Sequence, residues 1–137
     1  SVLSATEGER KGVPYQLVPY ITDKMGEVLS ASDLVIGRAG SMVFEIAAFG
    51  KPMILIPLSS AANDHQRANA YEFTNVGAAV VIEESNVTPG ILVSQIKSLL
   101  GDQVLRQKME TAVTTFFKPG AAKIIAEEVL RIAGVPL

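Results

Sequence analysis

Short apolar runs recur along the chain, each bounded by residues that favour turns or helix caps. They are Tyr15–Val18, Asp33–Gly37, Pro52–Pro57 and Ala78–Ile82. Three of these runs are nearly continuous in apolar residues instead of alternating with polar ones. Such continuity is typical of strands that are buried on both faces, as in parallel sheets. Val2–Ala5 is a further candidate for a strand.

Helices are expected between and after these runs. They span roughly residues 22–31, 41–49, 63–76, 89–100, 102–116 and 121–133. Thr22, Thr88 and Asp102 are expected to cap three of them, because their side-chain oxygens can accept from free backbone N–H groups. Pro89 occupies a first helical position, where its missing N–H costs nothing. The last helix places a set of apolar residues on one face: Ala121, Ile125, Val129 and Ile132.

Alternation of strands and helices with short connections predicts an α/β fold with a parallel sheet and right-handed crossovers. The last three helices have no strand between them, so we expect them to pack on one face of the sheet. No repeat, low-complexity segment or linker interrupts the pattern, and residues 1–137 are interpreted as one domain.

Composition and charge exclude several classes of function. The chain has 12 Lys and Arg, 14 Asp and Glu and a net charge of -2, which argues against a nucleic-acid partner. It has no Cys and one His, so disulfides and a Cys nucleophile are excluded and no metal site is expected. Neither a secretory signal nor a membrane-length apolar run is found, so a cytoplasmic location is expected.

Small and polar residues follow three of the runs, at Pro19–Thr22, Gly37–Ser41 and Pro57–Gln66. Open parallel sheets bind ligands beyond the carboxyl ends of their strands, so these segments are the candidate site. Gly37 and Gly40 either permit a tight turn or let a ligand approach the backbone.

The polar side chains near this edge each allow two interpretations. Glu45 lies on a solvated helix face, or its carboxylate accepts two hydrogen bonds from the vicinal hydroxyls of a ribose. Asn63 and Gln66 resemble a capping box, which would explain both without a ligand. His65 is the single His, which is more often structural, but it lies in a first helical turn at the ligand-binding edge.

Other motifs of chemistry are missing from the sequence. There is no Walker-type Gly-Lys-Ser/Thr, no Gly-x-Ser-x-Gly elbow, and no close carboxylate pair suited to a glycosidase. Glu83 and Glu84 follow an apolar run, but their neighbours Ser85 and Asn86 favour an exposed loop.

A longer pattern resembles a known family. It comprises Arg38-Ala-Gly-Ser, Glu45-Ile-Ala-Ala-Phe-Gly-Lys-Pro-Met-Ile-Leu-Ile-Pro-Leu, Asn63-Asp-His-Gln-Arg-Ala-Asn-Ala and Val76-Gly-Ala-Ala. The chain is similar, over most of its length, to the later part of the donor-binding domain of the MurG family. These are GT-B glycosyltransferases of family 28, with two Rossmann-like domains and a cleft between them.

The resemblance implies a function. MurG-type enzymes transfer GlcNAc from UDP-GlcNAc to lipid I, giving lipid II for peptidoglycan synthesis and cell-wall growth. It implies no cofactor and no metal. It implies peripheral association of the full-length protein with the cytoplasmic face of the cell membrane. The acceptor site and the catalytic residues are expected in an N-terminal domain that this sequence does not include, so no catalytic residue is assigned here.

The resemblance also implies which residues bind UDP-GlcNAc. Ile21 and Met25 would meet the uridine, Glu45 the ribose hydroxyls, and His65 with Gln66 the GlcNAc hydroxyls. Ser41, Met42 and Val43 would lie beside the diphosphate and ribose. The full expected set is Ile21, Met25, Arg38, Gly40, Ser41, Met42, Val43, Glu45, His65, Gln66 and Asn69.

Two other functions stay open at this point. The chain could be a sugar-nucleotide-binding subunit without chemistry of its own, which needs a partner chain to complete the site. It could also be a flavodoxin-like interaction domain, in which the Gly and Asn residues serve only as caps and turns. If replacing Glu45 lowers the affinity for UDP-GlcNAc, the chain binds the donor; an unchanged affinity favours the flavodoxin-like interaction domain.

Overall fold

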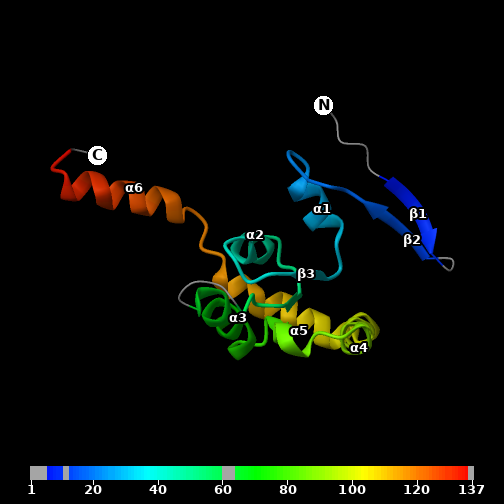
Figure 1. Cartoon of the computed structure of the whole chain (residues 1–137). Helices are drawn as coiled ribbons and strands as arrows, with labels where there is room; N and C mark the ends of the chain where they lie inside the picture. Colours follow the sequence, from blue (N-terminus) through cyan, green and yellow to red (C-terminus); the bar gives the residue numbers. More distant parts are fainter. Residues whose placement is uncertain (1–5, 11–12, 60–63, 136–137) are drawn as a thin grey trace. The chain divides into compact units, whose positions relative to one another are not determined.

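A computed structural model describes residues 6–10, 13–59 and 64–135 of the chain (Figure 1). Two compact units are found, Ser1–Ser32 and Asp33–Leu137. The expected strand at residues 2–5 lies outside the described residues. Whether the chain acts as a single domain stays a prediction.

The first unit holds a hairpin and one helix. Strands β1 (Thr6–Arg10) and β2 (Val13–Leu17) pair in antiparallel register. The expectation that the run at 15–18 joins the parallel sheet is therefore wrong. Tyr15 and Leu17 are exposed, unlike the side chains of a strand covered on both faces.

Helix α1 (Met25–Ala31) begins three residues later than the expected cap at Thr22. The Thr22 hydroxyl donates to the adjacent Asp23 carboxylate at 3.0 Å, and Lys24 holds the N-cap position without a side-chain bond. The prediction of Thr22 as a cap is therefore wrong, because the helix begins at Met25 and the residue that precedes it is Lys24, not Thr22.

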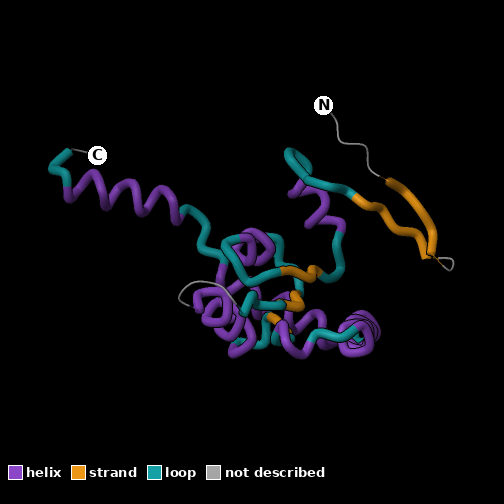
Figure 2. The backbone as a smooth tube through the Cα atoms, viewed as in Figure 1, coloured by secondary structure: helices purple, strands orange, loops and turns teal. Residues whose placement is uncertain are grey.

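The second unit contains the parallel sheet that the apolar runs predict. Strands β3 (Val35–Gly37), β4 (Met53–Leu55) and β5 (Ala79–Val81) lie in the order β3-β4-β5 and are parallel throughout. Figure 2 draws them as short orange segments among the helices of this unit. All side chains of the central strand β4 are buried.

Helices α4 (Pro89–Gly101) and α5 (Gln103–Val113) cover one face of this sheet. Ile54 of β4 joins Ile82, Leu99 and Met109 in one buried apolar cluster. Burial of such side chains is the main favourable term in folding. The expected packing of the late helices on a sheet face is confirmed for these two.

Helices α2 (Met42–Ala48) and α3 (His65–Asn75) connect the strands and cover the opposite face, as two successive right-handed crossovers require. Met53 and Leu55 alternate with Ile54 and therefore point to that face. The Phe73 ring of α3 lies 5.8 Å from the Phe44 ring of α2. It also stacks on Phe116, whose turn η3 (Thr114–Phe116) follows α5.

Local caps fix where α4 and α5 begin. The Thr88 hydroxyl accepts from the Ile91 N–H at 3.2 Å, and the Asp102 carboxylate accepts from the Leu105 N–H at 2.8 Å. Both expected caps are confirmed, because each side chain satisfies a backbone donor that the first helical turn leaves free.

The last helix, α6 (Ala121–Ile132), does not bury its apolar face. Ile125, Val129 and Ile132 are all exposed, Ile132 to 73%. The expectation that this helix packs on the sheet with the two before it is therefore wrong.

In the described part of the chain, no helix combines the length and apolarity that crossing a membrane requires.

Candidate functional site

The loops that follow β3, β4 and β5 leave the sheet at a single edge, because the three strands are parallel. Arg38 follows β3, Ser59 lies in the loop after β4, and Glu83 and Glu84 follow β5. This carboxyl edge is where open α/β sheets bind their ligands.

Arg38 lies in an ion pair at this edge. Its Nη2 donates to Oε1 of Glu84 at 2.8 Å, and its Nη1 donates to the Ile56 carbonyl at 3.2 Å. The Arg38 side chain is 49% exposed and that of Glu84 is 32% exposed. The guanidinium, which the sequence assigns to the donor site, is thus engaged by the protein itself.

Glu84 uses its second oxygen on another loop. Oε2 accepts from the Ser59 hydroxyl at 2.6 Å and from the Ser59 N–H at 3.1 Å. These two bonds, followed by the Arg38 guanidinium, lower the pKa of Glu84 to about 2. Glu84 is therefore a carboxylate at every physiological pH, and it joins the loops after β3, β4 and β5.

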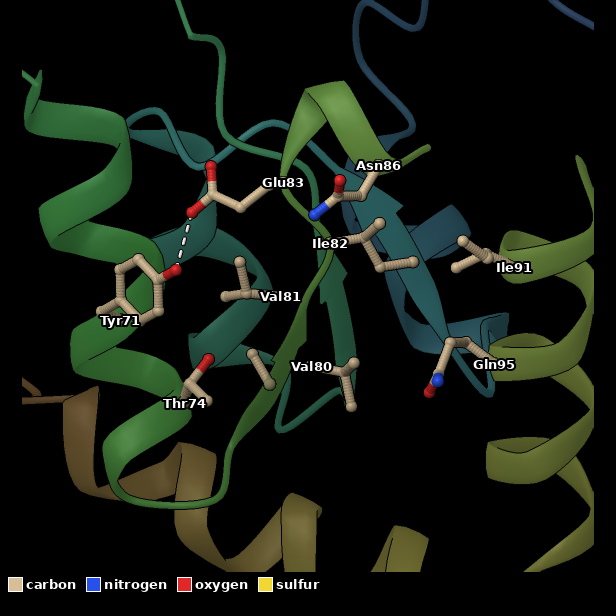
Figure 3. Close-up of a pocket in the computed structure, with 10 residues that line it drawn as sticks. Tyr71, Thr74, Val80, Val81, Ile82, Glu83, Asn86, Ile91 and Gln95 are labelled. Atoms are coloured by element: carbon tan, nitrogen blue, oxygen red, sulfur yellow. Dashed lines mark hydrogen bonds between the residues drawn. The ribbon is translucent and has the colours of Figure 1, made fainter. Parts of the chain in front are cut away.

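Glu83 makes a second cluster beside the first. It accepts from the Tyr71 hydroxyl at 2.6 Å (Figure 3) and from Nε and Nη2 of Arg67, each at 3.3 Å. Tyr71, with Arg67, lowers the pKa of Glu83, and the Glu83 carboxylate raises the pKa of Tyr71 and Arg67. The cluster holds α3 to the end of β5.

The sequence analysis missed both carboxylates. It expected Glu83 and Glu84 in an exposed loop, but both are half-buried, and Glu84 opens the short 3-10 turn η2 (Glu84–Asn86). One signal was available, since two adjacent carboxylates directly follow a strand of a parallel sheet at its ligand-binding end.

Two pockets lie near these clusters. One of about 430 Å³ adjoins the Arg38–Glu84 pair, with Ile36, Gly37, Ile56 and Val87 completing its wall. The other, of about 470 Å³, lies between α3, β5 and α4, and Tyr71, Val81 and Gln95 are among the residues around it (Figure 3). Arg38 is the one expected donor residue that lines either of them in the described part of the chain.

Gly40 has open space on its Cα. Its φ lies outside the left-handed region, and a Cβ built there would meet no atom within 4 Å; the same holds for Gly37. A strained turn therefore does not explain either glycine. The described residues show no steric need for either glycine, and close approach of a ligand to the backbone stays a prediction.

The start of α2 carries four expected site residues. Ser41 and Met42 are exposed, whereas the Val43 side chain is fully buried in the core, so Val43 has only its backbone to offer a ligand. Glu45 is exposed on α2, and within the described residues it makes no hydrogen bond or ion pair. Its carboxylate is free to accept hydrogen bonds.

The residues beside Glu45 on α2 differ in burial. Ile46 and Ala47 are buried in the core, whereas Phe44 is 49% exposed although its ring contacts that of the buried Phe73. Phe44 therefore meets the core with part of its ring only.

Gln66 does not take part in a capping box. Its Oε1 accepts from the Leu58 N–H at 3.0 Å, so the side chain holds the loop after β4. Asp64, at φ 57°, is the N-cap of α3 and makes no side-chain cap bond, while Asn63 lies outside the described residues. His65 is exposed at the start of the helix.

Asn69 ties α3 to the loop after β3. Its Nδ2 donates to the Ala39 carbonyl at 3.1 Å, in a partly buried position. The structure thus brings Arg38, Gly40, Gln66 and Asn69 together through shared loops. Ile21 and Met25 belong to the first unit, where both are half-buried, and their convergence with this group stays a prediction.

No metal-binding group is evident. In residues 6–10, 13–59 and 64–135, no three His, Asp or Glu side chains gather in a way that could hold an ion.

Comparison with known proteins identifies relatives that match most of the chain. The profile of the glycosyltransferase family 28 C-terminal domain matches residues 3–125. A UDP-N-acetylglucosamine–N-acetylmuramyl-(pentapeptide) pyrophosphoryl-undecaprenol N-acetylglucosamine transferase of Clostridioides difficile (strain 630) is 44% identical over 87% of the chain. The protein of the same name from Lawsonia intracellularis (strain PHE/MN1-00) is 41% identical over 84%.

A solved structure agrees in fold. The crystal structure of Acinetobacter baumannii MurG matches 83% of the chain with a TM-score of 0.74 and 32% identity. The α/β class with a Rossmann-like parallel sheet is thereby confirmed. The chain spans 29% and 32% of the two curated relatives and 33% of the solved chain, so it corresponds to about a third of each.

Proposed function

The chain belongs to the glycosyltransferase family 28 C-terminal domain family, and from this membership we propose that it is the donor-binding part of a GlcNAc transferase. It binds UDP-GlcNAc for transfer of GlcNAc to the undecaprenol-linked muramyl-pentapeptide acceptor, lipid I. The product is lipid II, a precursor of peptidoglycan. The two relatives described above, whose names give this activity, are 44% and 41% identical to the chain.

One observation supports donor binding most directly. Glu45 presents an exposed carboxylate, without a partner among the described residues, on the helix that follows the open Gly40 backbone. A carboxylate in that position accepts two hydrogen bonds from the vicinal hydroxyls of a ribose. Gly40 leaves room beside it for the diphosphate, next to Ser41 and Met42.

The other expected residues complete the assignment. His65 and the amide nitrogen of Gln66 bind GlcNAc hydroxyls, while the Gln66 oxygen keeps its bond to Leu58. By the family resemblance, the backbone of Ile21 is assigned to the uracil and Met25 to the uridine. Val43 contributes through its backbone, and Asn69 acts through the loop that contains Ala39.

The chemistry follows from the bonds exchanged. The acceptor hydroxyl attacks the anomeric carbon of GlcNAc, the bond from that carbon to the phosphate oxygen breaks, and UDP leaves, so the configuration inverts. This chain holds the uridine and sugar in a fixed orientation, which lowers the entropy cost of the displacement. The attacking hydroxyl belongs to lipid I, and the site that binds this acceptor and the group that takes its proton are assigned to a further domain of the full-length enzyme.

The remaining assignments concern the full-length protein. We place it at the cytoplasmic face of the cell membrane as a peripheral protein, because its acceptor is lipid-linked. No cofactor is needed for a single displacement from an activated sugar.

Calorimetric titration of the chain with UDP-GlcNAc tests the proposal. Glu45→Ala removes the ribose acceptor and weakens binding by about 1–3 kcal/mol, the cost of losing charge-assisted hydrogen bonds. Glu110→Ala, on an exposed position of α5, is the matched control and leaves affinity unchanged. An unaltered titration curve for Glu45→Ala would contradict donor binding at this edge.

A further inference from the structure

One carboxylate joins the loops after all three parallel strands. Glu84, after β5, contacts Arg38, after β3, and Ser59, after β4. Arg38 in turn donates to Ile56 in the loop after β4. The residues that meet here are 25 and 46 positions apart in the sequence.

We propose that Glu84 is a positioning residue for the sugar nucleotide, which holds the loops after β3 and β4 in the arrangement that donor binding requires. The inference rests on the donor-binding function proposed above. Glu84 itself does not touch the donor in this assignment. It acts through Arg38 and through the loop that contains Ser59.

The charges in this cluster indicate what Arg38 does. A nucleoside diphosphate is an anion and attracts a free guanidinium. Here the Arg38 guanidinium is already paired with Glu84 at 2.8 Å and bound to a backbone carbonyl. Arg38 is therefore a brace between two loops, and not the principal counter-ion of the diphosphate.

The low pKa of Glu84, about 2, agrees with this geometry, because two donors of Ser59 and the Arg38 guanidinium all favour the charged carboxylate. Both bonds from Ser59 act on the loop that leads toward α3, where Gln66 also holds the Leu58 N–H. The loop after β4 is thus fixed at two neighbouring residues.

The cluster is separate from the core that stabilises the fold. Its ion pair is half-exposed, and exposed pairs contribute little to global stability. The buried cluster beside β4 consists of apolar residues only. Loss of the carboxylate should therefore loosen the loops and leave the sheet intact.

The effect of Glu84→Ala on UDP-GlcNAc binding shows whether Glu84 holds the loops or competes with the diphosphate for Arg38. If Glu84 braces the loops, Glu84→Ala weakens UDP-GlcNAc binding by about threefold to tenfold, the range for losing net hydrogen bonds of ordinary strength. If Glu84 merely competes with the diphosphate for Arg38, the same substitution frees the guanidinium and tightens binding. Tighter or unchanged binding overturns the inference.

A second readout separates positioning from general destabilisation. Uridine, UDP and UDP-GlcNAc are titrated against the unaltered chain and against Glu84→Ala. Because the braced loops are assigned to the diphosphate and the sugar, the affinity for uridine stays constant while those for UDP and UDP-GlcNAc fall. An equal fall for all three, with a lower thermal midpoint, overturns the positioning role.

Further variants guard against misfolding and nonspecific effects. Ser59→Ala removes one bond to Glu84 but keeps both charges, and it gives a smaller loss in the same direction. Glu128→Gln breaks an Arg–Glu pair of the same kind on α6 and leaves all three affinities unchanged. Failure of Ser59→Ala to weaken UDP-GlcNAc binding counts against the inference even if Glu84→Ala does not fold.

The design distinguishes the two proposals. If the unaltered chain binds UDP-GlcNAc and Glu45→Ala weakens it while Glu84→Ala does not, only the positioning role is overturned. If the unaltered chain binds none of the three ligands, the donor-binding function is overturned, and the positioning role falls with it.

Discussion

The carboxyl edge of the sheet and helix α6 use the same pairs of charged residues in different ways. At the edge, Arg38 and Glu84 are 46 positions apart and join separate loops. On α6, Arg131 pairs with Glu128 and Lys123 with Glu127, each within a single helical turn or little more. Long-range pairs constrain tertiary structure, whereas pairs three or four residues apart only support the helix that carries both partners.

The two regions also differ in what lies beneath their charges. Under the edge, Ile54 of β4 lies in a buried apolar cluster with Ile82, Leu99 and Met109, while the apolar face of α6 is exposed. A charged pair can therefore hold a site in place only where an underlying core already fixes the elements that it connects. Four predictions test this difference between the carboxyl edge of the sheet and helix α6.

The largest effect is expected in the core. Leu99→Ala leaves a cavity beneath the sheet and lowers the free energy of unfolding by about 2–5 kcal/mol, as measured by chemical denaturation. Ile132→Ala, on the exposed face of α6, serves as the matched control and changes it by less than about 0.5 kcal/mol. Equal costs would show that α6 is as well packed as the core.

A smaller effect is expected where α3 meets the loop after β3. Asn69→Ala removes the partly buried bond to the Ala39 carbonyl and costs about 0.5–1.5 kcal/mol of stability. The same variant lowers UDP-GlcNAc affinity, because the loop of Arg38 and Gly40 is released. Thermal unfolding and calorimetric titration measure the two effects on one sample, and a loss of stability without loss of affinity would contradict the assigned role.

Acid should weaken the edge through Glu84. Folding lowers the pKa of this group from 4.5 to about 2, so the folded state holds the proton less tightly than the unfolded chain does. The stabilisation is fully present above about pH 4.5 and is lost as the pH falls toward 2. Because this stabilisation acts on the loops and not on the sheet, the UDP-GlcNAc affinity of the unaltered chain, measured by calorimetric titration, declines more steeply over this range than that of Glu84→Gln, and parallel curves would refute the prediction.

The smallest effect is expected on α6 itself. Glu128→Gln removes the bonds to Arg131 at 2.8 and 2.5 Å, but both side chains are largely exposed. The thermal midpoint of the second unit stays unchanged, while circular dichroism registers a slight loss of helix. A measurable fall in the midpoint would mean that α6 is coupled to the sheet.

The comparison also explains which parts of the structure sequence patterns predict well. The strands β3, β4 and β5 follow from continuous apolar runs, and Thr88 and Asp102 identify two helix starts through bonds to residues three positions ahead. Thr22 was also expected to cap a helix from its residue type, but its hydroxyl bonds to Asp23 and Lys24 is the N-cap of α1.

The sequence by itself determined the α/β class, the order of strands and helices from β3 onward, and the edge at which Glu45, Gln66 and Asn69 were sought. These follow from local propensity and from periodic burial, which act between residues close in the chain. Only the tertiary structure decided that β2 pairs with β1, that Gln66 holds Leu58, and that Glu84 meets Arg38 and Ser59. The Glu84 contacts join positions 25 and 46 residues apart, so no local pattern of residues records them. The β1–β2 and Leu58–Gln66 contacts are closer in the chain, but an apolar run or a cap-like spacing does not specify which of several possible partners is used.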